Sequence, residues 1–487
     1  MSSKISIDPI TRLEGHGRID IFLDDAGDVK NAYLIIPELR GFEKFAEGRP
    51  VEELPRITPR ICGVCPEAHH FASAKACDAV YKVQIPPTAR KLRELEYSAF
   101  FAGDHATHFY ILGGPDFVMG PDADPAVRNI LGVIGKVGLE IASKVIQQRA
   151  NAHKVIKTLG GRPTHSVNLL PGGMSKSINE EECKEFEEMA KFAVEFGKFS
   201  LQLFRDVVLA NKAYVDVILS EPYKLDSYYM GLVDENNKVN FYDGKVRVVG
   251  PDGKEFAKYA PADYLEHIAE HVEPYTYLKY PYLKKIGWKG LTDGPQSGMY
   301  QATPLSRLNA SDGMATPLAQ EAYEEFYATL GGKPVKATLA AHWARLIEML
   351  YAGERWLELA TDPEITNPNV RTIPTAVPSE GVGIVEAPRG TLTHHYITDE
   401  RGIVKKANLI VGTTNNYAAI SAVVRNVAKA LIKGGKADNA TLNMVEMGFR
   451  SYDPCFGCAT HALGRTPLEI RIMGPDGELL QRLTQNL

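Results

Sequence analysis

Cysteine is scarce in this chain, and long apolar runs are missing from it. Its 487 residues include six cysteines, which argues against a disulfide framework in a chain large enough to build a hydrophobic core. No apolar run approaches the roughly 18 residues of a membrane-spanning helix. The opening "MSSKISIDPITRLEGHGRID" has no apolar segment like that of a signal peptide. We therefore expect a cytoplasmic protein with no transmembrane segment, unless a partner that has its own signal carries it out of the cell.

The chain also lacks a strong charge bias. It has 55 Lys and Arg against 60 Asp and Glu, a net charge of −5, which is too mild to suggest nucleic acid or an anionic membrane as a partner. With 44% hydrophobic and 24% charged residues, the composition is typical of a soluble globular protein. No glycine-rich dinucleotide fingerprint stands between a predicted strand and a predicted helix. We expect no nucleic-acid partner.

Helical periodicity is the first feature that the sequence does show. Apolar residues recur at helical spacing, and the predicted long helical stretches cover approximately residues 87–112, 125–159, 177–210, 317–359 and 416–433. A capping box from Ser177 to Glu180 is expected to open the third stretch. Glycine pairs are expected to interrupt the fourth stretch near residues 331–332 and to stop the fifth at residues 434–435.

Short strands are expected around these helices. Alternating apolar and polar residues predict hairpins over residues 18–36 and 245–259 and a further sheet over residues 390–411. Residues 218–312 are less regular and rich in Tyr, Pro and Gly. The predicted fold class is α+β, predominantly α: a bundle of long helices at the core with small peripheral β-sheets and hairpins, forming one compact unit.

Four of the six cysteines form two Cys-x-x-Cys pairs, Cys62 with Cys65 and Cys455 with Cys458. Such a pair places two thiolates within reach of one metal ion, and two pairs complete a tetrahedral sphere. Nearly the whole chain separates the pairs, which fits a zinc ribbon poorly because the loop to be closed is so long. Structural zinc, a catalytic soft-metal site and two unrelated thiol pairs all remain open from the spacing alone. The two single cysteines are expected to be small buried hydrophobic side chains: Cys77 and Cys183.

The residues around both pairs resemble a known family. "RICGVCPEAH" and "DPCFGCATH" resemble the two signatures of the large subunit of nickel–iron hydrogenases. The motifs "DPITRLEGHGRI", "RGFEKFAEGR", "GDHATHFYILGGPD", "PGGM", "EAPRG" and "LIVGTTNN" follow in the family's order, so the resemblance covers nearly the whole chain. It looks most like the cytosolic, cofactor-coupled enzymes, NAD-linked bidirectional or electron-bifurcating. The resemblance implies reversible heterolytic cleavage of H2, which needs an electrophilic metal and a nearby base.

The resemblance implies a nickel–iron centre held by the four cysteines. Cys62 and Cys455 would be terminal nickel ligands, whereas Cys65 and Cys458 would bridge nickel and iron. Carbon monoxide and cyanide would complete the iron. The resemblance also implies a buried Mg²⁺ held by Glu43, the carbonyl of Leu409 and His461. The glutamate and the carbonyl fit the preference of this ion for hard oxygen ligands, and the histidine is the less usual ligand. The stretch expected to line the cyanides is Val411, Gly412 and Thr413. Many relatives have proline at the position of Gly412, so this chain departs from the family there.

The resemblance also implies a set of catalytic side chains. Glu14 matches the proton-transfer glutamate beside Cys455, a role that needs a carboxylate pKa raised by partial burial. His69 matches the imidazole that hydrogen-bonds a bridging thiolate and tunes its charge. Above the open metal position, Arg389 would present its guanidinium while two carboxylates hold it. Those carboxylates are Asp104 and Asp453.

The residues after the second pair are expected to be removed during maturation. In the family the chain is cut after the histidine of the second signature, which would divide this chain into a mature domain, residues 1–461, and an extension, residues 462–487. A maturation endopeptidase and a nickel-insertion chaperone are the implied partners. The extension is predicted to form a hairpin, "PLEIRIM" with "ELLQRL".

Electron transfer requires further partners. No cysteines remain to bind an iron–sulfur cluster, so an iron–sulfur small subunit is implied, with further NAD, flavin or iron–sulfur electron-transfer subunits. Two other interpretations stand beside this one. A non-catalytic subunit of a quinone-reducing respiratory complex shares the fold but lacks the four cysteines, and a structural-zinc protein would hold zinc in them.

Overall fold

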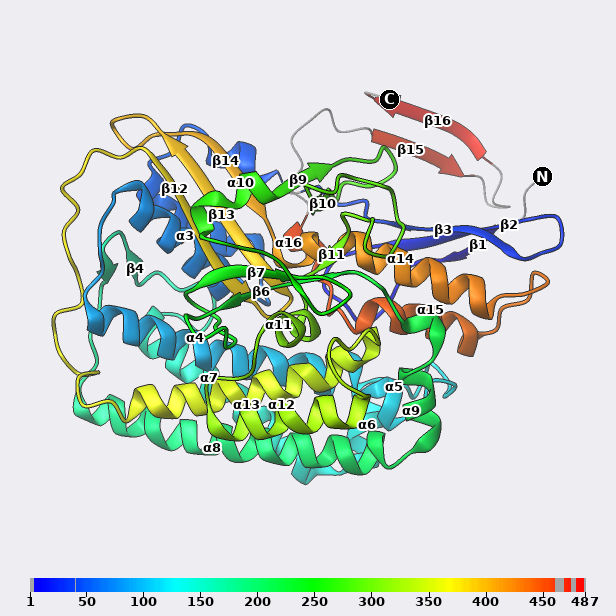
Figure 1. Ribbon diagram of the computed structural model, residues 1–487, viewed down its shortest axis with the longest axis horizontal. Helices are drawn as coiled ribbons and strands as arrows, with labels where there is room; N and C mark the ends of the chain where they lie inside the picture. The colour runs from blue at the N-terminus through cyan, green and yellow to red at the C-terminus, as the bar shows by residue number, and fades with distance from the viewer. Residues whose placement is uncertain (1–3, 40, 460–467, 474–478, 486–487) are drawn as a thin grey trace.

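A bundle of long helices forms the core of the molecule, as the sequence predicted. The computed structural model describes residues 4–39, 41–459, 468–473 and 479–485. Helix α13 packs against α8 and α4, and α4 packs against α7. These four helices lie together in the lower half of Figure 1. The bounds of these helices and of α12 beside them are α4 Pro87–Thr107, α7 Leu139–Gly160, α8 Glu180–Phe204, α12 Pro317–Leu330 and α13 Ala341–Ala360.

The predicted helical stretches are confirmed in place, with corrected ends. The stretch 125–159 is two helices, α6 (Ile130–Val137) and α7, because Gly138 with φ +89° separates them. The capping box lies two residues later than predicted. Asn179 accepts the Glu182 N–H and the Glu182 carboxylate accepts the Asn179 N–H, so α8 begins at Glu180. Among the described helices of ten or more residues, two were not predicted from the sequence: α3 (Pro66–Val80) and α15 (Asn439–Arg450).

Small, mostly antiparallel sheets accompany the bundle, as predicted, and lie on its upper side in Figure 1. The first sheet has the order β1-β2-β3, the second β11-β6-β7-β8, and the third β12-β13-β14. A two-stranded sheet pairs β9 with β10. All but the parallel pair β11–β6 are antiparallel. The strands are β1 Lys4–Ile7, β2 Arg18–Leu23, β3 Val29–Ile35, β6 Tyr228–Val233, β7 Lys245–Val249, β8 Glu255–Tyr259, β9 Ile268–His271, β10 Tyr280–Leu283, β11 Tyr300–Gln301, β12 Glu380–Ala387, β13 Gly390–Thr398 and β14 Val404–Ile410.

Two sets of packing contacts bring the segments that carry the two cysteine pairs to one place. Helix α3 packs on β12 and β13, which puts its first turn, directly after Cys65, inside the molecule. Helix α14 (Gly412–Leu431) packs on β3 and on α15, and α15 leads into the short helix α16 (Phe456–Ala459), which carries Cys458. Blue and red segments therefore meet near the centre of Figure 1.

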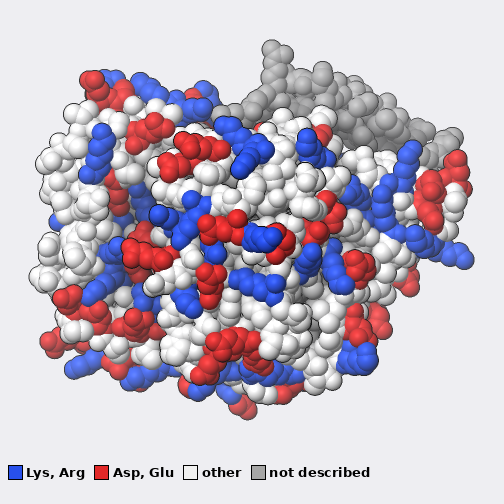
Figure 2. Space-filling model, viewed as in Figure 1, with Lys and Arg blue, Asp and Glu red and all other residues white. Residues whose placement is uncertain are grey.

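The predicted C-terminal hairpin is present at the edge of the molecule. Strands β15 (Leu468–Met473) and β16 (Leu479–Gln485) pair antiparallel, and Figure 1 shows them outside the main body. Among the described residues, none of the helices combines the length and the apolar character that crossing a bilayer requires. Acidic and basic side chains are interspersed over the face in Figure 2, in keeping with the mild net charge.

Candidate metal centre

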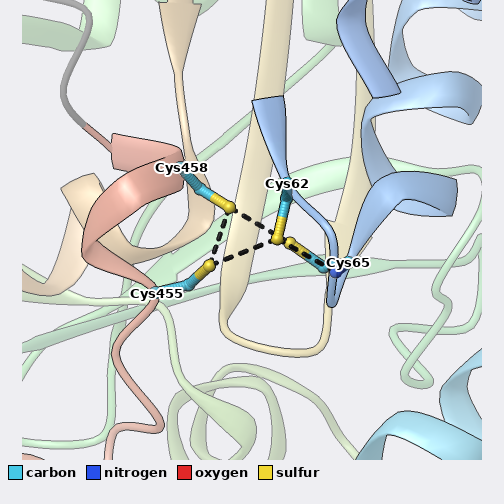
Figure 3. A group of neighbouring side chains, drawn as sticks. All are labelled: Cys62, Cys65, Cys455 and Cys458. Carbon is cyan, nitrogen blue, oxygen red and sulfur yellow. Dashed lines mark hydrogen bonds between the residues drawn. The ribbon is translucent and has the colours of Figure 1, made fainter. Parts of the chain in front are cut away.

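The four paired cysteines converge on one buried point. Their sulfur atoms all lie within 4.8 Å of one another, and each side chain is buried. The shortest distances between pairs join Cys62 Sγ to Cys455 Sγ, 3.4 Å, and Cys65 Sγ to Cys458 Sγ, 3.5 Å. Figure 3 shows one pair entering from the segment before α3 and the other from α16. Among the described residues, this is the one group of His, Cys, Asp or Glu side chains found with metal-ligand spacing.

Local structure aims these thiols and sets their charge. Cys65 is the N-cap of α3, where the helix dipole favours a thiolate. Hydrogen bonds with Cys455 and Cys458 also act to lower the pKa of Cys65, but the hydrogen bond with Cys62 and burial outweigh them and raise it. Burial acts to raise the pKa of Cys62, but hydrogen bonds from the other thiols and from the Cys65 amide lower it well below its usual value. Burial raises the pKa of Cys455 and Cys458. The pKa values of the four thiols are thus shifted in different directions, and a bound metal ion would deprotonate all of them.

Glu14 joins the N-terminal segment to the second cysteine pair. Its Oε2 lies 3.0 Å from Cys455 Sγ and accepts the Gly457 N–H at 3.0 Å. Glycine permits this close approach, since a Cβ on Gly15 (φ +89°) would lie 2.6 Å from the Gly457 nitrogen. Burial raises the pKa of Glu14 and the charge on Cys62 adds to this, while hydrogen bonds from Cys455 and Gly457 oppose it. The family resemblance implied a carboxyl beside Cys455, and the structure brings Glu14 to that sulfur.

A buried ion cluster clamps the same two segments together. The carboxylate of Asp116 pairs with Arg12, two residues before Glu14, and with Arg450 at 3.1 Å, near the end of α15. Arg450 also donates to the Thr11 carbonyl at 3.2 Å. Burial opposes ionisation of Asp116, yet the two arginines lower its pKa. The arm that carries Glu14 and the helix that precedes Cys455 are thereby held in register.

A guanidinium and two carboxylates form one buried ion group, here called the canopy, close enough to the sulfur cluster for the charges of Cys65 and Cys455 to act on the guanidinium. Arg389 donates to Asp104 Oδ2 at 3.2 Å and lies 3.1 Å from Asp453 Oδ2. All three side chains are buried. Burial raises the pKa of Asp104 to about 6, with Arg389 opposing. Although burial acts in the same direction on Asp453, Arg389 and His108 hold its pKa below the usual range.

Several residues that support this canopy were not found from the sequence. His108 Nδ1 lies 2.9 Å from Asp453 Oδ1. Arg307 pairs with Glu348 at 2.6 Å and Glu386 at 2.9 Å and donates to the Ala387 and Pro388 carbonyls, directly before Arg389. Asn416 donates to the Arg389 carbonyl at 2.6 Å. Three of these residues, His108, Glu386 and Asn416, lie inside the quoted motifs, but no role had been assigned to them.

Two models of known protein families match this chain. The model of the nickel-dependent hydrogenase family matches residues 40–127 and 218–461, and a model described as HoxL-like matches residues 4–39. The chain belongs to the nickel-dependent hydrogenase family. It is a catalytic large subunit of a nickel–iron hydrogenase, and Cys62, Cys65, Cys455 and Cys458 form its metal site.

Relatives of this hydrogenase protein cover it from end to end. It is 49% identical over 482 residues to an F420-non-reducing hydrogenase iron-sulfur subunit of Archaeoglobus profundus, covering 99% of each chain. It is 38% identical over 495 residues to the beta subunit of the NAD-reducing hydrogenase HoxS of Cupriavidus necator, again covering 99% of each. A solved NAD⁺-reducing [NiFe]-hydrogenase, H2-reduced, superimposes with a TM-score of 0.88 at 35% identity, covering 94% of this chain and 99% of that one.

The stretch that was expected to line the cyanides contacts a ligand cysteine in the structure. Thr413 Oγ1 accepts the Cys455 N–H at 2.9 Å, so its hydroxyl positions a ligand cysteine. Val411 is the N-cap of α14 and Gly412 is its first residue. A Cβ on Gly412 would lie 3.0 Å from the Gly390 nitrogen, so the chain passes directly under the Arg389–Gly390 backbone.

The expected magnesium site is built in part from described residues. Glu43 Oε1 accepts the Leu409 N–H at 2.9 Å, and Oε2 is buried with no hydrogen-bond partner in the described part of the chain. Since the N–H and C=O of one strand residue point the same way, the Leu409 carbonyl also faces Glu43. Lys279 Nζ lies 3.3 Å from Glu43 Oε1, a cation that was not expected from the sequence. His461 lies outside the described residues.

The expected partner of a bridging thiolate, His69, is fully buried one helical turn after Cys65. Its Nε2 has no hydrogen-bond partner within the described ranges, and its Nδ1 lies 3.1 Å from His394 Nε2. Burial lowers the pKa of His69 to about 4, with the charge on Cys62 opposing. The ring is therefore neutral at physiological pH.

Proposed function

We propose that this chain carries out reversible cleavage of H2 at the cysteine cluster and passes the electrons to an iron–sulfur small subunit. The observation that carries the proposal is the cluster itself: four buried cysteine sulfurs with a carboxyl 3.0 Å from one of them and a guanidinium above. When bound, the nickel–iron centre supplies the electrophile at which H2 is polarised. Cys62 and Cys455 are the proposed terminal ligands, and Cys65 and Cys458 the bridging ones.

Glu14 is the proposed proton carrier. Its Oε2 takes a proton from the Cys455 sulfur across 3.0 Å and passes it outward. Because burial raises the pKa of this carboxyl, it changes between its ionised and protonated forms at a pH closer to neutral than an exposed glutamate does. Arg389 keeps a fixed positive charge over the site, and Asp104 and Asp453 hold it there.

The remaining proposed roles belong to residues that would lie around the metals. His69 donates to a bridging thiolate through Nε2, and the segment Val411, Gly412 and Thr413 lines the cyanides of an iron that also carries carbon monoxide. Glu43 Oε2, the Leu409 carbonyl and His461 hold Mg²⁺. The orphaned, buried Glu43 Oε2 supports the last of these.

We also propose that residues 462–487 are an extension removed after nickel insertion, by an endopeptidase that acts with a nickel-insertion chaperone. The separate β15–β16 hairpin at the edge of the molecule supports this, since its removal would leave the helical core intact. The intact mass of active enzyme tests the idea. We expect the mass of a chain that ends at His461. An active enzyme that retains the full chain would contradict the idea.

The proposed enzyme is cytoplasmic and delivers electrons to a soluble carrier through partner subunits. The likeness to an F420-non-reducing and to an NAD-reducing hydrogenase supports a carrier-coupled complex. Purified complex should reduce NAD⁺ or another soluble carrier with H2. Infrared spectra of the mature protein should show metal-bound carbon monoxide and cyanide, and metal analysis should give nickel and iron. Zinc in their place would favour the structural-zinc interpretation.

A further inference from the structure

A second buried arginine, Arg307, lies behind the segment that carries Arg389. It belongs to α11 (Pro304–Ala310) and is fully buried. A guanidinium has five N–H groups, and those of Arg307 meet five acceptor oxygens at 2.6 to 3.2 Å. The acceptors belong to two glutamates and to the two residues directly before Arg389: Glu348, Glu386, Ala387 and Pro388. A rigid planar fork therefore holds the chain that leads into Arg389.

Glu348, on α13, extends this hold to a carboxylate partner of Arg389. Its two oxygens accept from Arg307, each at 2.6 Å, and its Oε2 also lies 2.9 Å from His105 Nε2. His105 directly follows Asp104 on α4. One buried carboxylate thus ties the segment of Arg389 to the helix of Asp104, whose side chains pair at 3.2 Å.

Asn416, on α14, holds the same segment from a further helix. Its Nδ2 donates to the Arg389 carbonyl at 2.6 Å, and its Oδ1 accepts the Ala302 N–H at 2.7 Å. The three successive carbonyls of residues 387–389 therefore each accept a hydrogen bond from a buried side chain. Gly390 follows with φ +152°, and a Cβ there would lie 2.6 Å from the Gly412 carbonyl oxygen, so the backbone has no room to shift toward α14.

Arg389 itself makes fewer contacts than Arg307. Its Nη1 donates to Asp104, its Nη2 lies 3.1 Å from Asp453 Oδ2, and its Nε has no hydrogen-bond partner in the described part of the chain. Two contacts at the tip of a long side chain leave it free to pivot unless its backbone is fixed. The backbone of residues 387–389 therefore decides where this positive charge lies.

We propose that Arg307 and Asn416 are positioning residues, which set the place of the Arg389 guanidinium beside the cysteine cluster by fixing the backbone of residues 387–389. This rests on the proposed function, in which that guanidinium keeps a positive charge over the metals. Both residues act through Arg389 and not on the reacting atoms. Their loss should slow H2 cleavage and leave the metals bound, because other segments carry the four cysteines.

Two variants of the mature complex loosen this backbone. Arg307→Lys keeps the positive charge but replaces five fixed donors with three on a flexible chain. Asn416→Ala removes the donor to the Arg389 carbonyl. The second variant keeps the proposal testable if the first does not fold, since it leaves the buried ion pairs of Arg307 intact.

Each variant has a matched control elsewhere in the core. Arg93→Lys controls for the loss of a buried arginine, because Arg93 is also fully buried, pairs with Asp78 at 2.7 Å and donates to two backbone carbonyls. Asn309→Ala controls for the loss of a buried amide. Asn309 donates to the Val335 carbonyl at 2.8 Å and accepts the Val335 N–H at 3.1 Å.

The first readout is kcat/KM for H2, with nickel and iron content measured, for each variant alone and combined with Arg389→Lys. Arg307→Lys and Asn416→Ala should each lower kcat/KM by about 10-fold or more, because a misplacement of about 1 Å can cost about 100-fold. In the Arg389→Lys background each should cost less than about twofold, since the group that they position is gone. Both controls should stay within about twofold in either background.

Crystal structures of the variants give a readout that does not depend on turnover. In both variants the Arg389 guanidinium should lie farther from Asp104 and Asp453 than the 3.2 and 3.1 Å found here. An unmoved Arg389, or equal losses of kcat/KM with and without Arg389→Lys, would overturn the proposal. Absence of H2 turnover from metal-replete wild-type complex would instead refute the proposed function.

Discussion

Glu14 Oε2 lies 3.0 Å from the Sγ of Cys455, across 441 residues of chain. The contact is fixed on both sides, since the Phe456 N–H donates to the Glu14 carbonyl at 3.0 Å and the Gly457 N–H donates to the carboxylate. This fixed contact is the basis of the proposed role of Glu14 as the proton carrier.

Glu14→Gln should therefore lower H2 turnover by about 100-fold or more, the usual effect of removing a general acid–base group. Nickel and iron content should stay normal, because the amide is isosteric and still accepts the Gly457 N–H. Proton–deuterium exchange and metal analysis check this. Glu38→Gln is the control, as Glu38 pairs with His16 at the surface nearby. Loss of the metals in Glu14→Gln would show a structural role.

Cys455→Ser should abolish H2 turnover and lower nickel content. The serine hydroxyl is a harder and less readily deprotonated ligand than a thiolate. Cys77→Ser is the matched control, because Cys77 is also buried but donates to the Val51 carbonyl at 3.1 Å, outside the cluster. Nickel analysis of both variants decides the matter, and full nickel in Cys455→Ser would contradict the ligand role.

Asp116→Ala should loosen the clamp between the two segments. It leaves Arg12 and Arg450 buried without their carboxylate, and breaking a buried ion pair from one side costs about 3 kcal/mol. Lower stability in urea is expected together with lower activity, since the Glu14 arm loses its anchor. Unchanged stability would mean that Glu446, which also pairs with Arg450, suffices.

The free energy of unfolding should fall as the pH falls, and the buried imidazole of His70 should account for part of this fall. Burial lowers its folded pKa to about 4, below its unfolded value of about 6.5. The unfolded chain therefore binds more protons between these values. The contribution of His70, about 3 kcal/mol, is fully present above about pH 6.5 and is lost as the pH falls toward 4.

His70→Gln should make this fall less steep between about pH 7 and pH 5, as measured by urea midpoints. The ring donates from Nδ1 to the Pro55 carbonyl, and Nε2 lies 3.2 Å from the Leu169 nitrogen and 3.0 Å from Asn168 Oδ1. The contacts with Pro55 and Asn168 act to raise the pKa of His70, but burial has the larger effect and lowers it. The exposed control His16→Gln should keep the steep fall. Equal slopes for wild type and His70→Gln would show that His70 does not titrate in this range.

Magnesium should bind in competition with Lys279. The ammonium of Lys279 lies beside Glu43 and would repel a bound Mg²⁺. Lys279→Met removes this positive charge, so Mg²⁺ should resist chelator more strongly than in wild type. Glu43→Gln should lose the ion. Metal content after dialysis against chelator is the measurement. Glu270→Gln, which leaves Lys279 with Glu43 alone, should weaken Mg²⁺ binding.

Much of the fold followed from local pattern. The α8 stretch shows clear amphipathic spacing and a capping residue, and the β2–β3 and β7–β8 hairpins have alternating strands about short turns. Helix α3 was missed because it is buried on most sides. Nearly all its residues are small or apolar, or polar with buried partners, so it shows no amphipathic face.

The sequence by itself determined which residue types are available to the metals: two Cys-x-x-Cys pairs with their flanking motifs, whose short spacing is a local property of the chain. Tertiary structure alone decided that Cys62 meets Cys455 and that Asp453 is shared by Arg389 and His108. It also decided that Lys279 faces Glu43 and that His394 backs His69. Contacts between distant segments, and the burial that shifts each pKa, arise only when helices and sheets pack together, and no local pattern contains them.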